Sequence, residues 1–282
     1  MNRIGFRNLF AAFALCCLLV PAGLPGQEPV SKPLIQAPAP AQATPAPVAT
    51  APAPAAATPS PHPDNDYWRK HDELLKVDFG WLAKFKEADA ALPPPAEGES
   101  RVVFMGDSIT EGWHFTGPQG SFPGKPYINR GISGQTTPQM LVRFRQDVIA
   151  LKPKVVVILA GTNDIAGNTG PETPEQIEDN LASMADLATA NHIRVVLCSI
   201  LPATDYWWRP GLTPAPKILV INAWMKAYAA QKGYVYVDFH SAMKDEHDGL
   251  PATLSRDGVH PLPAGFAVMT PLEEAGIEKA LR

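Results

Sequence analysis

Four short runs of mostly β-branched, apolar residues recur from residue 102 onward, and they constrain the fold more than any other feature of the chain. They lie at residues 102–105, 155–160, 195–201 and 235–237. Amphipathic segments separate them, at residues 137–151, 174–190 and 216–231. Strands that are apolar on both faces and alternate with helices are typical of a parallel sheet covered on both sides. The pattern therefore predicts an α/β fold, a three-layer α/β/α sandwich with a mostly parallel sheet.

A further helical segment precedes the first of these runs. Large apolar residues recur at mostly three- and four-residue spacings between Trp68 and Phe85, which predicts helix over residues 66–92. Gly80 lies within this segment and is a point at which the helix can divide in two.

Short motifs with reactive side chains follow the predicted strands. The first apolar run ends in Gly-Asp-Ser at residues 106–108, and the second in Gly-Thr-Asn-Asp at residues 161–164. Asn-Arg-Gly-Ile-Ser-Gly-Gln lies between them at residues 129–135, and Asp-Gly-Val-His lies near the C-terminus at residues 257–260. Ligands of such folds bind outside the carboxyl ends of the strands. The motifs therefore stand where a site is expected.

Ser108 and His260 are the candidate nucleophile and base. A serine hydroxyl is a weak nucleophile until a base accepts its proton, and an imidazole titrates near neutral pH. The histidine needs its second ring nitrogen held by another group, and Asp257 stands three residues earlier on the same loop. Asp107, beside the serine, and Asp238, after the fourth run, are alternative acids.

The four motifs, in this order, resemble the blocks of the SGNH (GDSL-type) hydrolase superfamily, and the resemblance extends from about residue 101 to the end. It implies a flavodoxin-like sheet and a serine esterase that works through a Ser108-His260-Asp257 triad and an acyl-enzyme. It also implies that an oxyanion is held by the backbone N–H groups of Ser108 and Gly134 and by the side-chain amide of Asn163. The structural role that the family pattern gives to Asp107 and Asp164 argues against a catalytic one.

The third run leads into an aromatic loop at residues 202–210, which predicts a substrate rim of Trp207, Trp208 and Arg209, with Trp113 joining it. Such rings suit sugar faces or aryl groups, although they can equally serve to pack the loop down. The prediction is hydrolysis of short-chain acyl esters, in particular O-acetyl groups on carbohydrate. Two alternatives are a lysophospholipase or thioesterase for longer acyl chains and a catalytically inactive module that binds carbohydrate or cell wall.

Several classes of function find no support in the sequence. The net charge is −4 and no basic run is present, which argues against a nucleic-acid partner. The chain has no G-x-S-x-G elbow, no P-loop and no G-x-G-x-x-G. His240 and His247 lie near acidic residues without metal-ligand spacing, so we expect no metal and no cofactor. The expected partner is a small-molecule or carbohydrate ester.

The N-terminal region has a different composition. Arg3 and Arg7 precede an apolar run at residues 9–20, which predicts a signal peptide over residues 1–26. A Pro/Ala-rich disordered linker is predicted over residues 27–65 and an SGNH hydrolase domain over residues 66–282. We therefore expect an exported protein, periplasmic or secreted, without stable membrane insertion after signal cleavage. Tethering through an uncleaved anchor, or through lipid on Cys16 or Cys17, is the alternative.

Overall fold

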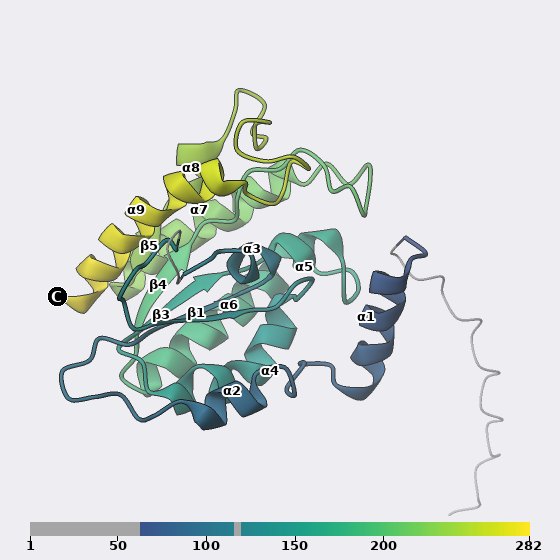
Figure 1. Ribbon diagram of the computed structural model, residues 1–282. Helices are drawn as coiled ribbons and strands as arrows, with labels where there is room; N and C mark the ends of the chain where they lie inside the picture. Colours follow the sequence, from purple (N-terminus) through teal and green to yellow (C-terminus); the bar gives the residue numbers. More distant parts are fainter. Residues whose placement is uncertain (1–62, 116–119) are drawn as a thin grey trace, which may run out of the picture. The chain divides into compact units, whose positions relative to one another are not determined.

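The computed structural model describes residues 63–115 and 120–282, which belong to a compact unit spanning residues 57–282 (Figure 1). The predicted signal peptide and nearly all of the predicted linker fall on residues 1–62 and lie outside the described residues. In the part of the chain that is described, no helix is both long enough and apolar enough to cross a membrane.

The centre of the unit is a parallel sheet in the strand order β2-β1-β3-β4-β5. Its strands are β1 (Val102–Gly106), β2 (Tyr127–Gly131), β3 (Val155–Leu159), β4 (Arg194–Cys198) and β5 (Val235–Val237). Four of them are the apolar runs of the sequence, and every pairing is parallel. β2 was not predicted as a strand. It lies at an edge of the sheet, and its sequence Tyr-Ile-Asn-Arg-Gly contains no apolar run: the first three residues are partly exposed, and Arg130 and Gly131 are buried.

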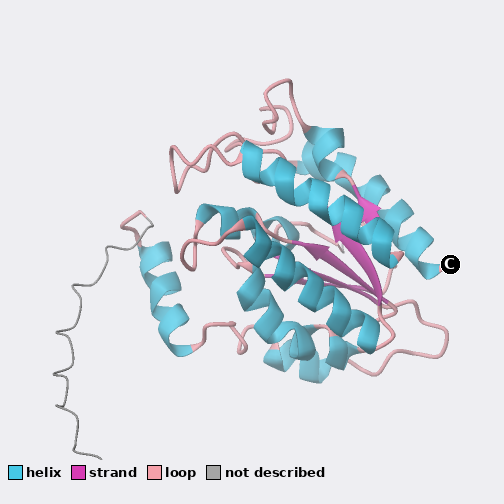
Figure 2. Ribbon diagram, turned by 180° about the vertical axis from the view of Figure 1, so that it is seen from behind, coloured by secondary structure: helices cyan, strands magenta, loops and turns pink. Residues whose placement is uncertain are grey.

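Helices cover both faces of the sheet, so the predicted three-layer sandwich is confirmed (Figure 2). Alternate strand residues contribute to two separate cores. One core contains Val103 and Val156 with apolar residues of α4 (Thr137–Asp147), α6 (Pro174–Ala190) and α7 (Ala215–Lys232). The other contains Phe104 and Val157 with residues of α8 (Phe239–Met243) and α9 (Pro263–Leu281). Two short helices, α3 (Ser108–Glu111) and α5 (Thr162–Ala166), follow β1 and β3, and a 3-10 turn at Ile149–Leu151 follows α4.

The predicted helix over residues 66–92 is two helices, α1 (Asp66–Val77) and α2 (Lys86–Ala91). Asn65 caps α1 by accepting a hydrogen bond from the Trp68 N–H at 3.1 Å. Gly80 lies in the connection, where a Cβ would come within 2.8 Å of Val142 on α4. The division at Gly80 therefore brings this connection tightly against the body of the fold.

The register of the sheet brings the sequence motifs to one edge. Gly106 pairs with Gly131 on one side and with Leu159 on the other, so β1, β2 and β3 end at the same level. The segments that follow these three strands therefore start side by side.

Candidate active site

Ser108 is the first residue of α3, directly after β1. Asp107 is the N-cap of this helix, and its carboxylate accepts a hydrogen bond from the Ile109 N–H at 2.9 Å. The tight turn from strand to helix holds the serine hydroxyl at the carboxyl edge of the sheet. His260 and Asp257 come from the loop between α8 and α9.

A chain of hydrogen bonds joins the three predicted triad residues. The Ser108 Oγ lies 2.9 Å from His260 Nε2, and His260 Nδ1 lies 2.7 Å from Asp257 Oδ2. The other carboxylate oxygen of Asp257 accepts hydrogen bonds from the backbone N–H groups of Val259 (3.0 Å) and His260 (2.8 Å) and from the Ser255 hydroxyl (3.1 Å). The loop thus folds around the carboxylate and orients the imidazole toward the serine.

The pKa of Asp257 is set by two opposing effects. Partial burial raises it, but the hydrogen bonds from the His260 ring and from the backbone N–H groups outweigh burial and lower the pKa to about 2. Asp257 is therefore ionised throughout the neutral range and can support a positive charge on the histidine.

The alternative acids have other partners. Asp238 caps α8, where its carboxylate accepts hydrogen bonds from the Ser241 N–H and the Ser241 hydroxyl, each at 2.9 Å. Asp107 is buried, and burial raises its pKa to about 6 despite the Ile109 hydrogen bond. Asp164 is also buried and bonds the Thr137 N–H at 2.7 Å. Only Asp257 is hydrogen-bonded to the His260 ring among the described acids.

Three potential donors surround the Ser108 hydroxyl. Within the described residues, neither the Ser108 N–H nor the Gly134 N–H has a hydrogen-bond acceptor. Asn163, the third, donates from Nδ2 to the Gln135 carbonyl at 3.0 Å and lies at 3.3 Å from Asp107 Oδ2. All three residues line the same pocket. The residues predicted for the oxyanion hole are therefore brought together around the serine.

Gly134 lies between β2 and α4 in a conformation with φ of +80°. A Cβ at this position would also meet His71 and the Tyr67 hydroxyl of α1 at 3.3 Å. Both the backbone angle and the close approach of α1 thus favour glycine. Glu111 supports the same turn, since its carboxylate accepts hydrogen bonds from the N–H (2.8 Å) and the hydroxyl of Ser133.

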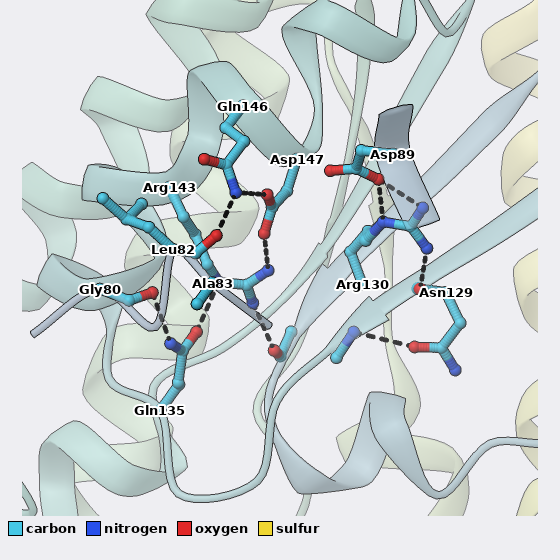
Figure 3. Close-up of polar contacts among 12 residues, drawn as sticks. Gly80, Leu82, Ala83, Asp89, Asn129, Arg130, Gln135, Arg143, Gln146 and Asp147 are labelled. Carbon is cyan, nitrogen blue, oxygen red and sulfur yellow. Dashed lines mark hydrogen bonds and ion pairs between the residues drawn. The ribbon is translucent and has the colours of Figure 1, made fainter. Parts of the chain in front are cut away.

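A buried polar network lies beneath this turn (Figure 3). Arg143 donates to the Gln135 side chain at 2.6 Å, to Asp147 at 3.0 Å and to the Gly106 carbonyl at 3.1 Å. Gln135 in turn donates to the Gly80 carbonyl at 3.1 Å. Arg143 therefore connects the end of β1, the turn after Gly134 and the connection that follows α1.

A pocket of about 290 Å³ opens over the serine. It is lined by the reactive residues and by aromatic side chains from two segments, which are referred to as its walls. The loop after β4 supplies Trp207 and Trp208, and α1 supplies Tyr67 and Trp68. Trp207 is 54% exposed, whereas Trp208 is buried and stacks on Tyr206 at a centroid distance of 4.9 Å. The aromatic rim thus has a second source, α1, for which the sequence pattern predicted only a helix because no motif near Ser108 points to it.

Two residues predicted for the rim lie elsewhere. Trp113 is 1% exposed and packs among aromatic rings of the α9-side core, including Phe104, Phe122 and Phe266. The prediction that Trp113 joins the rim is therefore wrong, because its side chain is packed in the core. Arg209 does not line the pocket, and its guanidinium lies beside Gly167.

The histidine-rich stretch near residue 240 forms no ligand set. No group of three or more His, Cys, Asp or Glu side chains in residues 63–115 or 120–282 is arranged to hold a metal ion. His240 is buried, and burial lowers its pKa. Its backbone N–H donates to the Ser199 hydroxyl at 2.8 Å.

Comparison with known proteins gives a consistent result. A solved structure of a Bacteroides fragilis protein described as an acylhydrolase has a TM-score of 0.70 and 46% identity, and the match covers 73% of this chain and 99% of that one. An acetylxylan esterase of Xylanibacter ruminicola is 26% identical over 248 residues, which are 75% of this chain and 48% of the relative. The chain thus spans about half the length of that relative. An acetylxylan esterase of Geobacillus stearothermophilus is 27% identical over 210 residues, 63% of this chain and 94% of the relative.

The match to a family model decides the classification. The model of the GDSL-like lipase/acylhydrolase family matches residues 104–268, more than half of the chain. That span contains Ser108, Gly134, Asn163 and His260, and it confirms the resemblance carried by the four motifs. The chain belongs to the GDSL-like lipase/acylhydrolase family.

Proposed function

We propose that this protein is a serine esterase that removes short acyl groups, in particular O-acetyl groups from carbohydrate. The observation that carries the proposal is the chain of hydrogen bonds from Asp257 through His260 to Ser108. It ends in a pocket lined by Ser108 and Gly134, whose backbone N–H groups have no acceptor among the described residues. A binding module has no need of this combination.

In the proposed reaction, Ser108 Oγ attacks the acyl carbon while His260 Nε2 takes its proton. The carbonyl electron pair moves onto oxygen, and the N–H groups of Ser108 and Gly134 stabilise the resulting oxyanion. The intermediate collapses, and the leaving alcohol receives the proton from His260. Water then attacks the acyl-enzyme by the same sequence of proton transfers and releases the acid and free Ser108.

Asn163 is proposed as the third donor to the oxyanion. One of its two amide hydrogens goes to the Gln135 carbonyl at 3.0 Å. The second is directed to Asp107 over a longer distance of 3.3 Å, which makes this contact the weaker one. We infer that the oxyanion takes this second hydrogen, so that Asp107 is an alternative acceptor in the free enzyme.

The size and lining of the pocket support short acyl groups. A volume of about 290 Å³ lies at the lower end of the range for small-molecule sites. A long acyl chain gains about 0.8 kcal/mol for each buried CH₂, so an enzyme for lipids should present a continuous aliphatic trench. The described residues that line the pocket are instead aromatic, small or polar, and none of them is Leu, Ile or Val.

The two aromatic walls support a ring-shaped alcohol portion. Tyr67 on α1 and Trp207 on the loop after β4 are the exposed members of these walls. Indole and phenol rings contact the apolar faces of pyranose rings and leave the sugar hydroxyls in water. The names of the Xylanibacter and Geobacillus relatives, both acetylxylan esterases, agree with this assignment.

The direct test is a panel of p-nitrophenyl esters from acetate to palmitate, run beside acetylated xylan, with the Ser108→Ala variant as control. We expect acetate and acetylated xylan to be turned over and Ser108→Ala to lose at least about a thousandfold in kcat. A profile that peaks at decanoate or beyond would favour a lysophospholipase or thioesterase. Wild-type protein that binds xylan without releasing acetate would favour an inactive binding module.

Export of the protein remains a prediction from residues 1–26. Cell fractionation, followed by N-terminal sequencing of the mature protein, tests it. A mature chain in the periplasm or medium that begins after the apolar run supports cleavage, whereas an intact N-terminus in the membrane fraction supports a tether.

A further inference from the structure

Asn168 lies just after α5, outside the residues that the four motifs single out, and is 2% exposed. Its side chain connects three parts of the site. Nδ2 donates to the Gly134 carbonyl and to Asn163 Oδ1, both at 3.0 Å. Oδ1 accepts the indole N–H of Trp208 at 3.1 Å.

The first consequence concerns the orientation of the Asn163 amide. Asn168 offers an N–H to Asn163 Oδ1, so the oxygen of the Asn163 amide faces Asn168 and its NH₂ group faces Gln135 and Asp107. If the Asn163 amide rotated by 180°, its NH₂ group would meet the NH₂ group of Asn168. Its oxygen would then face the Gln135 carbonyl. The three hydrogen bonds that Asn163 makes with Asn168, Gln135 and Asp107 would be replaced by repulsive contacts, so Asn168 helps to select the orientation in which Asn163 is a donor.

The second consequence concerns the turn that carries Gly134. The carbonyls of Gly134 and Gln135 are successive acceptors, one for Asn168 and the other for Asn163, each at 3.0 Å. These two bonds hold the two peptide groups that follow Gly134, whose own φ is +80°. The N–H of Gly134 therefore belongs to a turn whose conformation depends on Asn168.

The third consequence concerns the pocket wall. Trp208 lines the pocket, and its ring centroid lies 6.4 Å from that of His260. Its indole N–H is the donor that fixes Asn168 Oδ1, so Nδ2 of Asn168 must point to Gly134 and Asn163. The same tryptophan thus packs beside the proposed base and orients the residue that holds the oxyanion donors.

We propose that Asn168 is a positioning residue of the oxyanion hole, which holds Asn163 and the Gly134 turn in the donating arrangement and is itself oriented by Trp208. The inference rests on the proposed esterase activity. It predicts that changes at Asn168 act through Asn163 and reduce stabilisation of the transition state rather than binding of the substrate.

Asn168→Asp is the sharpest perturbation because it keeps the shape and the acceptor for Trp208 but removes both donated hydrogens. We expect kcat for p-nitrophenyl acetate to fall about 10- to 100-fold with KM changed less than about twofold. Asn168→Ala should lower kcat to a similar extent. Because alanine adds no negative charge, this variant separates the loss of the two donated hydrogens from the charge that aspartate introduces.

A double-mutant cycle distinguishes positioning from a general structural role. In the Asn163→Ala background one of the donors that Asn168 orients is absent and only its hold on the Gly134 turn remains, so Asn168→Asp should cost at least about threefold less in kcat there than in the wild type. Asn222→Ala is the matched control, because Asn222 is also buried and makes two hydrogen bonds to Ile200, at 2.8 and 2.9 Å. We expect its effects on kcat to be the same in both backgrounds.

Thermal melts accompany the kinetics. If Asn168→Asp does not fold, Trp208→Phe replaces it. This change removes the indole N–H that orients Asn168 and also shortens the ring that lines the pocket, so the readout is the difference between backgrounds: kcat should fall about two- to fivefold more in the wild type than in Asn163→Ala. Provided that the wild type is active, two results would overturn the inference: fully additive effects of Asn168→Asp and Asn163→Ala on kcat, or a wild-type kcat in Asn168→Asp. A wild type that neither hydrolyses esters nor reacts with a fluorophosphonate at Ser108 would refute the proposed function, and the inference with it.

Discussion

Replacing Asp257 by asparagine exchanges one carboxylate oxygen for an NH₂ group and leaves the shape of the side chain unchanged. Oδ1 of Asp257 accepts three hydrogen bonds, from Ser255, Val259 and the His260 backbone, at 2.8–3.1 Å. Oδ2 faces His260 Nδ1 at 2.7 Å. In the variant the amide oxygen should stay with its three donors, so the NH₂ group must face the imidazole.

This orientation imposes the wrong tautomer on His260. With an NH₂ group opposite, Nδ1 must be the acceptor and Nε2 must carry the hydrogen, so Nε2 cannot take the Ser108 proton. Turning the amide would break three hydrogen bonds worth about 1 kcal/mol each. About 3 kcal/mol leaves less than about 1% of molecules in the active arrangement. Loss of the carboxylate beside the imidazolium adds to this, and we expect kcat/KM to fall about 10³- to 10⁴-fold.

The assay is hydrolysis of p-nitrophenyl acetate by Asp257→Asn, Asp257→Ala and Asp238→Asn at several pH values around neutrality. Asp257→Ala should be more active than Asp257→Asn, because an imidazole without a neighbour can adopt either tautomer, and it should also be milder than His260→Ala. Asp238→Asn should be close to wild type, since Asp238 bonds only Ser241 among the described residues. An asparagine variant that keeps a tenth of the activity, or exceeds the alanine variant, would refute the tautomer argument.

Three further predictions test the substrate, the chemistry and the stability. Trp207→Ala and Tyr67→Ala should raise KM for acetylated xylo-oligosaccharides about 3- to 10-fold and change p-nitrophenyl acetate hydrolysis less than about twofold; equal losses on both substrates would contradict the two-wall pocket. Dialysis against a strong chelator should leave the rate unchanged, because the proposed steps use only side chains and backbone N–H groups, and a loss reversed by zinc or calcium would count against them. Burial raises the pKa of Glu273 to about 7, and the hydrogen bond from Cys198 opposes this shift. Between about pH 4.5 and about pH 7 the native protein therefore keeps a proton that the unfolded chain releases, so the free energy of unfolding falls as the pH rises through this range. The Glu273 contribution to this fall is on the order of 3 kcal/mol, and Glu273→Gln should remove it when the free energy of urea unfolding is compared at acid and at neutral pH. An unchanged dependence of the free energy of unfolding on pH, or the same effect from the exposed Glu278→Gln, would contradict this prediction.

The sheet was predictable from the sequence because a strand buried on both faces must be apolar along its whole length. Residues 155–159 are all Val, Ile or Leu, and a helix of the same composition would have no polar face for water. β2 was not predicted because an edge strand does not need to be apolar along its length: Asn129 is partly exposed, and the buried Arg130 forms an ion pair with Asp89. Its neighbours in the sheet, not its own residues, make it a strand.

The order of the motifs along the chain, with Ser108 and Asn163 after expected strands and His260 on a loop near the C-terminus, predicted the candidate chemistry from the sequence. The periodicity of a segment shows which of its faces is buried but not what covers that face. For tryptophans in loops there is no periodicity to read, so only the tertiary structure decided that Trp113 lies in the core while Trp207 lies at the pocket. Only it decided that Tyr67, some forty residues before the serine, lines the pocket and that Asn168 is hydrogen-bonded to Gly134 and Asn163, since such contacts arise when distant segments pack together.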